Sequence, residues 1–224
     1  MEPDISTVQP SQRPVRIRAG QAILAGDLTV PEDPRGLVIF AHGTGSSRLS
    51  PRNRSVARTL VEAQLATLLL DLLSPEEEAQ DVHTGHLRFD VDLLGTRLLT
   101  ATDWARKERG VGLLRVGYFG ASTGAGAALV AAGKRPSAVH AVVSRGGRPD
   151  LAGDVLELVR APTLLIVGER DRAILPANEQ ALGRLRCPAV LEIIPKATHL
   201  FEEPGTLRMV ADLATRWFET HLAV

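Results

Sequence analysis

The feature that most constrains the fold is an alternation between short apolar runs and longer amphipathic stretches. Continuous apolarity, without period-two alternation, is typical of strands buried on both faces, as in a parallel sheet covered by helices. Strand followed by helix, repeated along the chain, predicts βαβ units with right-handed crossovers and an α/β fold. The apolar runs cover residues 36–41, 66–72, 113–119, 138–144, 162–167 and 189–194.

Two further strand-like runs lie near the N-terminus, over residues 15–18 and 22–30. Both carry charged residues and only a short turn separates them, so they predict an antiparallel hairpin at one edge of the sheet. Helices are predicted between the later strands, and Ser50-Pro51 is a clear N-cap followed by proline. The predicted helices cover residues 50–63, 90–107, 123–132, 151–159, 176–185 and 206–222, and residues 73–88 are expected to form a long loop.

Length and composition are those of one globular domain. The chain has 224 residues, of which 44% are hydrophobic and 23% charged, so it can form a core without disulfide or metal crosslinks. Residues 1–13 are rich in Pro, Gln and Ser and predict a flexible tail, followed by a single domain over residues 14–224. Cys187 is the only cysteine, which excludes an intramolecular disulfide and a multi-cysteine zinc site.

The charge balance narrows the class of partner. Lys and Arg total 26 and Asp and Glu total 26, and this zero net charge argues against nucleic acid or an anionic membrane as partner. The N-terminus has no apolar segment of the signal-peptide type, and no apolar run approaches the ~20 residues that span a bilayer. We therefore expect a cytoplasmic protein that binds a small molecule, needs no cofactor or metal, and is a monomer or homodimer.

A nucleophile motif stands between an apolar run and a predicted helix. Residues 120–124 read Gly-Ala-Ser-Thr-Gly and match the G-x-S-x-G pattern, in which a sharp strand-to-helix turn exposes the serine hydroxyl. The glycines suit such a turn because it leaves no room for Cβ atoms. The hydroxyl of Ser122 is a weak nucleophile at pH 7, so it requires a positioned base.

Residues that directly follow the strands supply the candidates for that base, because ligands of doubly wound sheets bind at the carboxyl ends of the strands. His199, after the last strand, is the predicted general base. Asp171, after the preceding strand, is the predicted acceptor that orients His199, and Glu169 and Asp150 are the alternatives. Ser, Asp and His then occur in the chain order of a hydrolase triad, each at a different strand end.

An oxyanion hole completes the predicted site. The backbone N–H of Thr123 is one expected donor, and the second is expected from the turn at residues 42–45, from Thr44 or from Gly45. The side chains that we predict to bind substrate are His86, Arg88, Arg48 and Arg145. His83 and His86 have the spacing of a metal-binding pair, but the pattern offers no third ligand, so no metal site is predicted.

The order of the elements, the His-Gly turn at residues 42–43, the elbow at 120–124, and Asp171 and His199 together resemble the α/β-hydrolase superfamily over about residues 15–222. Without a large cap insertion, the chain looks like the dienelactone hydrolase group. The resemblance implies an α/β-hydrolase fold with about eight strands in a mostly parallel sheet and helices on both faces. Dienelactone hydrolases carry a cysteine nucleophile, whereas this elbow holds Ser122, which favours a serine esterase.

The leading hypothesis is a serine hydrolase that cleaves a carboxylic ester, thioester or lactone through an acyl-enzyme intermediate. One alternative keeps the triad and changes the reaction, as in cofactor-free perhydrolases and in lyases. Another is a non-catalytic binding or regulatory module on a hydrolase scaffold, although such a module has no need for Ser, His and Asp together.

Overall fold

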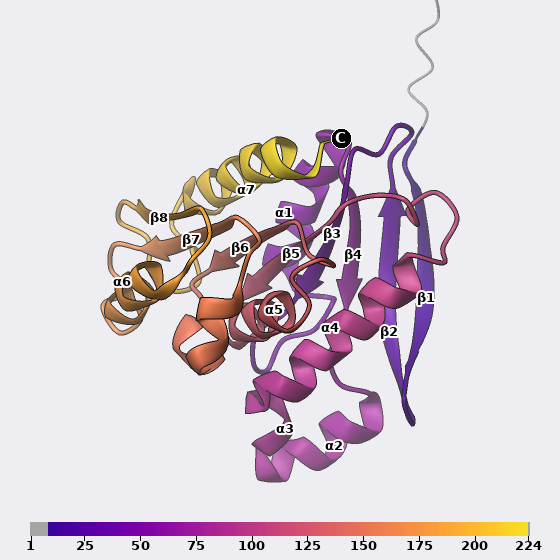
Figure 1. Cartoon of the computed structure of the whole chain (residues 1–224), viewed down its shortest axis with the longest axis horizontal. Coiled ribbons are helices and arrows are strands. Elements are labelled where there is room, and N and C mark those ends of the chain that lie inside the picture. Colours follow the sequence, from indigo (N-terminus) through magenta and orange to yellow (C-terminus); the bar gives the residue numbers. More distant parts are fainter. Residues whose placement is uncertain (1–8, 224) are drawn as a thin grey trace, which may run out of the picture.

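The computed structural model describes residues 9–223 and contains one eight-stranded sheet in the order β1-β2-β4-β3-β5-β6-β7-β8 (Figure 1). The six strands β3 to β8 are parallel to one another, and β1 and β2 form the predicted antiparallel hairpin at one edge. The prediction of a mostly parallel sheet is confirmed. The strands are β1 Ser11–Ala19, β2 Ala22–Val30, β3 Leu37–Ala41, β4 Ala66–Leu70, β5 Val116–Ala121, β6 Ala141–Arg145, β7 Thr163–Gly168 and β8 Ala189–Ile194.

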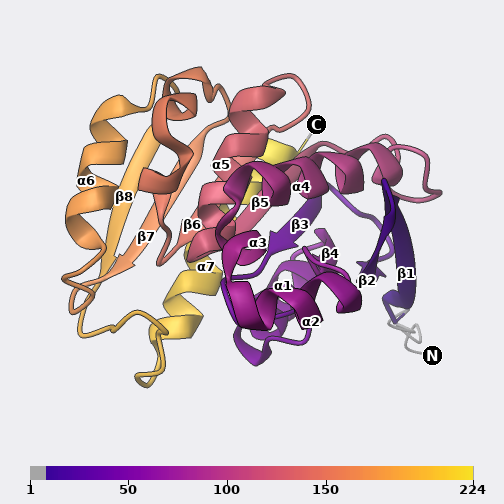
Figure 2. The same cartoon turned by 90° about the horizontal axis from the view of Figure 1, so that it is seen from below.

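Helices cover both faces of this sheet (Figure 2). The helices α4, α5 and α6 and the 3₁₀ helix η1 pack on one face, and α1 and α7 pack on the other, each over its own hydrophobic core. The central strands β3 and β5 are buried at every position, which explains why their sequences are continuously apolar. The helices are α1 Pro51–Glu62, α2 Pro75–Thr84, α3 His86–Phe89, α4 Val91–Ala105, α5 Thr123–Lys134, η1 Pro149–Leu158, α6 Leu175–Arg184 and α7 Thr206–Leu222.

Local sequence signals set the start of α1 as predicted. The side chain of Ser50 accepts a hydrogen bond from the N–H of Asn53, and Pro51 occupies the first helical position. The helix then buries Val56 and Leu60 against the sheet. This packing fixes the position of the loop before α1, which runs along the carboxyl edge of the sheet.

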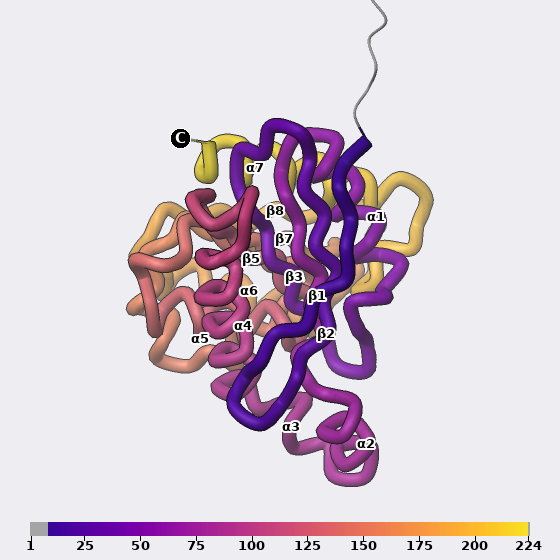
Figure 3. Tube along the Cα trace, turned by 90° about the vertical axis from the view of Figure 1, so that its right-hand side faces the viewer, coloured from indigo at the N-terminus to yellow at the C-terminus, as the bar shows by residue number. Residues whose placement is uncertain are grey.

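The segment after β4 differs from the prediction, because residues 73–88 form two helices instead of a long loop. Figures 1 and 3 show α2 and α3 projecting from the body of the molecule beyond the end of β4. Ser74 and Glu77 form a reciprocal capping box at the start of α2, which is a local sequence signal for a helix. The three consecutive glutamates of this segment, Glu76, Glu77 and Glu78, lie in the first turn of α2, where negative charge stabilises a helix.

Asp81 fastens the two short helices together. Its fully buried carboxylate accepts hydrogen bonds from the backbone N–H groups of Leu87 (2.6 Å) and Arg88 (3.2 Å) and pairs with the Arg88 side chain. The bridge fixes α3 against α2, so these residues have defined positions beside the carboxyl edge of the sheet.

The N-terminal boundary also differs from the prediction. β1 begins at Ser11, inside the stretch expected to be a tail, and residues 1–8 of that stretch lie outside the described residues. Within residues 9–223, no helix combines the length and apolar character needed to cross a bilayer.

Candidate active site

Ser122 lies at the strained turn between β5 and α5. Its backbone has φ = 52° and ψ = −122°, a positive-φ conformation that non-glycine residues adopt only when their surroundings impose it. The N–H of Ser122 donates to the carbonyl oxygen of Arg145 (3.2 Å), and its own carbonyl accepts from the N–H groups of Ala125 and Arg148 (3.1 Å each). These bonds hold the turn that a nucleophile elbow requires.

The two flanking glycines are needed for steric reasons. A Cβ on Gly120 would collide with the backbone of Ala125 in the first turn of α5. A Cβ on Gly124 would collide with the carbonyl oxygens of Ala41 and His42 at the end of β3. The elbow therefore forms because α5 starts in close contact with two neighbouring strands.

Gly124→Ala is expected to lower the free energy of unfolding by about 1–3 kcal/mol, because the added methyl group overpacks a site lined by backbone. The measurement is chemical denaturation of the variant beside the wild type. Gly183→Ala is the matched control, since a Cβ at Gly183 in α6 meets no atom within 4 Å. That helical control should be as stable as the wild type or more stable. Equal stability of Gly124→Ala and the wild type would contradict the steric account.

His199 and Asp171 form a direct pair. Nδ1 of His199 lies 2.7 Å from Oδ2 of Asp171, and the Asp171 side chain is 7% exposed. An ionised carboxylate only accepts hydrogen bonds, so beside ionised Asp171 a neutral imidazole carries its proton on Nδ1 and keeps the lone pair on Nε2. Gly146 lies close to the imidazole, since a Cβ added to it would be 3.4 Å from two ring atoms of His199.

Ser122 and His199 line one open cleft of about 430 Å³. The structure thus brings together the three predicted triad side chains, which come from the ends of β5, β7 and β8. The cleft is also lined by Asp150, the alternative acid, and by Arg148. Its other walls, Ala173, Ile174 and Ala177, were not predicted from the sequence.

The two alternative acids have other partners. Asp150 makes a bidentate pair with Arg148, through Nε (2.9 Å) and Nη2 (2.7 Å). The hydrogen bonds from Arg148 lower the pKa of Asp150, and the same bonds raise the pKa of Arg148. Glu169 accepts from the backbone N–H of Lys196 (2.7 Å). Asp171 is the acid in contact with His199.

The two expected oxyanion donors differ in their present hydrogen bonding. Thr123 is the first residue of α5, so its N–H has no intrahelical partner. The N–H of Thr44 donates to Oγ1 of Thr123 (2.9 Å), and the two threonine hydroxyls are 2.9 Å apart. Thr44 therefore lies directly beside the residue that follows the nucleophile, whereas Gly45 occupies a left-handed turn with φ = 70°.

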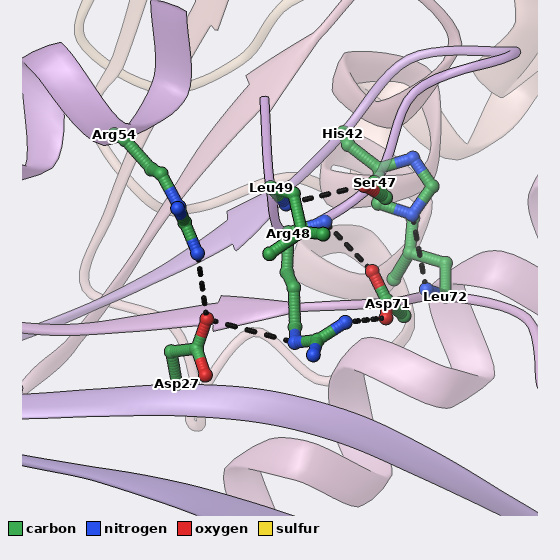
Figure 4. A network of polar contacts seen from close by, with 8 residues as sticks. All are labelled: Asp27, His42, Ser47, Arg48, Leu49, Arg54, Asp71 and Leu72. Carbon is green, nitrogen blue, oxygen red and sulfur yellow. Dashed lines mark hydrogen bonds and ion pairs between the residues drawn. The ribbon is translucent and has the colours of Figure 1, made fainter. Parts of the chain in front are cut away.

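A polar network anchors the rest of this loop (Figure 4). Asp71, directly after β4, accepts hydrogen bonds from the backbone N–H and from Nη1 of Arg48 (2.7 Å each). Arg48 and Arg54 both approach the carboxylate of Asp27 on β2. The N–H of Leu72 donates to Nε2 of the loop residue His42 (3.1 Å). The loop between β3 and α1 is thus bound to β2 and to the end of β4.

A second cavity, of about 530 Å³, is lined by Thr123, the residue that follows Ser122. Thr44 and Thr123 line it together with apolar residues that include Leu72, Leu73 and Leu94. Arg88 also lines it, in its ion pair with Asp81. Of the four side chains predicted to bind substrate, Arg88 is the one that the structure places at this cavity.

The other three side chains lie elsewhere. His86 is exposed on α3, with Nδ1 2.7 Å from the hydroxyl of Thr84. Arg48 belongs to the anchoring network. Arg145 is 7% exposed and lies over the ring of Phe201, and burial together with the nearby Arg52 lowers its pKa to about 10. Strand alternation explains this position, because Arg145 shares a face of β6 with residues buried under α1 and α7.

Within residues 9–223, no group of three or more His, Cys, Asp and Glu side chains is arranged to hold a metal ion.

Comparison with known proteins identifies close relatives. Residues 24–221 match the model of the Dienelactone hydrolase family. A solved dienelactone hydrolase from Anabaena variabilis is 56% identical, covers 96% of this chain and 100% of its own, and superimposes with a TM-score of 0.94. Est1E from Butyrivibrio proteoclasticus shares the fold, with a TM-score of 0.78 at 17% identity, over 92% of this chain and 98% of its own.

Two curated relatives from Mycobacterium tuberculosis strains are 57% identical over 208 residues, which is 93% of this chain. Both are described as putative phosphoribosyl transferases. The match covers 46% of each, so the chain spans about half the length of these relatives. The description therefore refers to proteins with a large additional region.

Proposed function

Because the chain belongs to the Dienelactone hydrolase family, we propose that it is a serine hydrolase of carboxylic esters, thioesters or lactones. The observation that carries the proposal is the shared cleft of Ser122 and His199, with Asp171 hydrogen-bonded to the far side of the imidazole. A nucleophile, a base and a group that orients the base are the minimal set for acyl transfer.

The proposed reaction has two halves. Oγ of Ser122 attacks the carbonyl carbon while Nε2 of His199 takes the hydroxyl proton. The carbonyl oxygen becomes an oxyanion, which the backbone N–H of Thr123 and a second backbone N–H, from Thr44 or Gly45, stabilise. The C–O or C–S bond then breaks, and His199 gives its proton to the leaving group. Water, activated by the same imidazole, hydrolyses the acyl-enzyme and regenerates Ser122.

Two spaces are available for the two arms of a substrate. The cleft beside His199 has small apolar walls at Ala173, Ile174 and Ala177. The larger cavity beside Thr44 mixes leucine side chains with the Arg88–Asp81 pair. We propose that the scissile carbonyl binds between them, above Ser122, because Thr123 lines one space and Ser122 the other.

Rapid-mixing kinetics with p-nitrophenyl acetate test the proposal. If an acyl-enzyme forms and deacylation is slower than acylation, nitrophenol appears in a burst of one equivalent per protein, followed by a slower steady rate. The acetylated species should be visible by intact-mass spectrometry during the steady phase. A folded protein that gives neither a burst nor any steady release would contradict the proposed activity.

A further inference from the structure

We infer that the hydroxyl of Thr123 is a positioning group for the oxyanion hole, in addition to the expected role of its backbone N–H. The inference rests on the proposed function and adds a residue to it. The Thr123 hydroxyl accepts a hydrogen bond from Thr44 and holds the loop at residues 42–45 in register with the elbow, so that the Thr123 N–H and the second oxyanion donor of that loop are arranged before the substrate binds.

The contact is direct and has two hydrogen bonds. Oγ1 of Thr123 accepts from the N–H of Thr44 at 2.9 Å and lies 2.9 Å from the Thr44 hydroxyl. Thr123 is 3% exposed, so its hydroxyl exchanges little with bulk water. A hydroxyl offers two lone pairs and one proton, and it can satisfy both contacts at once.

The part of the loop that receives this bond needs it. Thr44 is exposed and lies between Gly43 and Gly45. Glycine has more backbone freedom than other residues, so this part of the loop needs a contact to fix its position. A Cβ added to Gly43 would lie 3.0 Å from Cβ of Ser122, so the loop passes close to the nucleophile. A small shift of this segment would change the distance between the second oxyanion donor and the carbonyl oxygen of a substrate.

The other anchors of the loop act on either side of Thr44. His42 is bound at its ring to the N–H of Leu72, and Arg48 is bound to Asp71 (Figure 4). Between these anchors, Thr123 joins the loop to α5 through its side chain. The hydroxyl therefore restrains the position on which the second oxyanion donor depends.

The test compares Thr123→Val and Thr123→Ser with the wild type, using p-nitrophenyl acetate as the probe. Valine keeps the branched shape but cannot accept a hydrogen bond. Because misplacing a group by about 1 Å can lower the rate 10²-fold, kcat of Thr123→Val should fall about 10- to 100-fold while KM changes less than about threefold. Thr123→Ser keeps the hydroxyl and should recover kcat to within about threefold of the wild type.

Thr102→Val is the matched control for the loss of a buried threonine hydroxyl. Thr102 lies in α4, is fully buried, and shares a 2.7 Å hydrogen bond with the hydroxyl of Tyr118. This variant should unfold at a lower temperature and keep the wild-type kcat. Amide hydrogen exchange at Thr44 gives a readout that is independent of turnover, and it should speed up in Thr123→Val but not in Thr102→Val.

Each outcome bears on one claim. An unchanged or higher kcat in Thr123→Val would overturn the inference, and a higher value would mean that the hydroxyl masks the Thr44 N–H. A fall in kcat without faster exchange at Thr44, or without recovery in Thr123→Ser, would also overturn it. A folded wild-type protein with no turnover would instead overturn the proposed function, and exchange at Thr44 would still show whether the hydroxyl holds the loop.

Discussion

Replacing Ser122 with alanine should lower kcat for ester hydrolysis by about five to six orders of magnitude, because the covalent pathway is lost as a whole when its nucleophile is removed. The residual rate would come from binding and from the oxyanion hole. The measurement is steady-state hydrolysis of p-nitrophenyl acetate by the variant and the wild type, with protein purified separately for each to exclude carry-over.

The fold of this variant should remain intact. Ser122 owes its backbone conformation to bonds from its N–H and carbonyl groups, and alanine keeps both groups. Thermal unfolding should therefore differ little from that of the wild type. A Ser122→Ala protein that keeps its melting temperature and more than about a hundredth of the activity would contradict the assignment of Ser122 as the nucleophile.

Asp171→Asn should lower kcat by about 10⁴-fold with little change in KM, because an asparagine at this place favours the wrong tautomer of the imidazole. In the wild type, the 2.7 Å contact to Asp171 keeps the proton of His199 on Nδ1. An amide that donates its N–H to Nδ1 would move that proton to Nε2, and Nε2 would then be unable to accept from Ser122. The measurement is kcat and KM of both proteins across about pH 5 to 9.

Asp150→Asn is the matched control, because it makes the same chemical change in the same cleft. Asp150 pairs with Arg148 and does not contact His199, so its loss should lower kcat less than about tenfold, as expected for a partly exposed ion pair. If Asp150→Asn were the more damaging substitution, the acid of the triad would be Asp150 and the present assignment would be wrong.

Most of the fold follows from patterns that are local in sequence. The ranges 22–30, 189–194 and 206–222 were predicted to the residue, as β2, β8 and α7. Buried parallel strands leave continuous apolar runs, and capping residues mark the start of α1. The helices α2 and α3 were not predicted, although the capping box of Ser74 and Glu77 is a local signal for the start of α2.

The candidate triad was also accessible from sequence, because strand ends share one edge of a parallel sheet. Ser122, Asp171 and His199 each follow a strand. The structure places Ser122 and His199 in one cleft, with Asp171 hydrogen-bonded to His199. Side-chain contacts between distant segments were not accessible. The bond between Thr44 and Thr123 joins residues 79 positions apart, and no periodicity reports such a pair.

The arginines show the same limit. Proximity to a strand end suggested that Arg48 and Arg145 bind substrate. Arg48 is instead bound by Asp71 and Asp27, which come from two different strands and could be matched to it only in three dimensions. For Arg145, the alternation of β6 did carry the information, since it shares the face of Ala141 and Val143.

The most direct test of the central claim, an activated Ser122, is intact-mass analysis after treatment with a fluorophosphonate. The account predicts one adduct on the wild type and none on Ser122→Ala. Ser137→Ala, which removes an exposed serine outside the cleft, should be labelled like the wild type. An adduct on Ser122→Ala, or no adduct on a folded wild-type protein, would contradict the account.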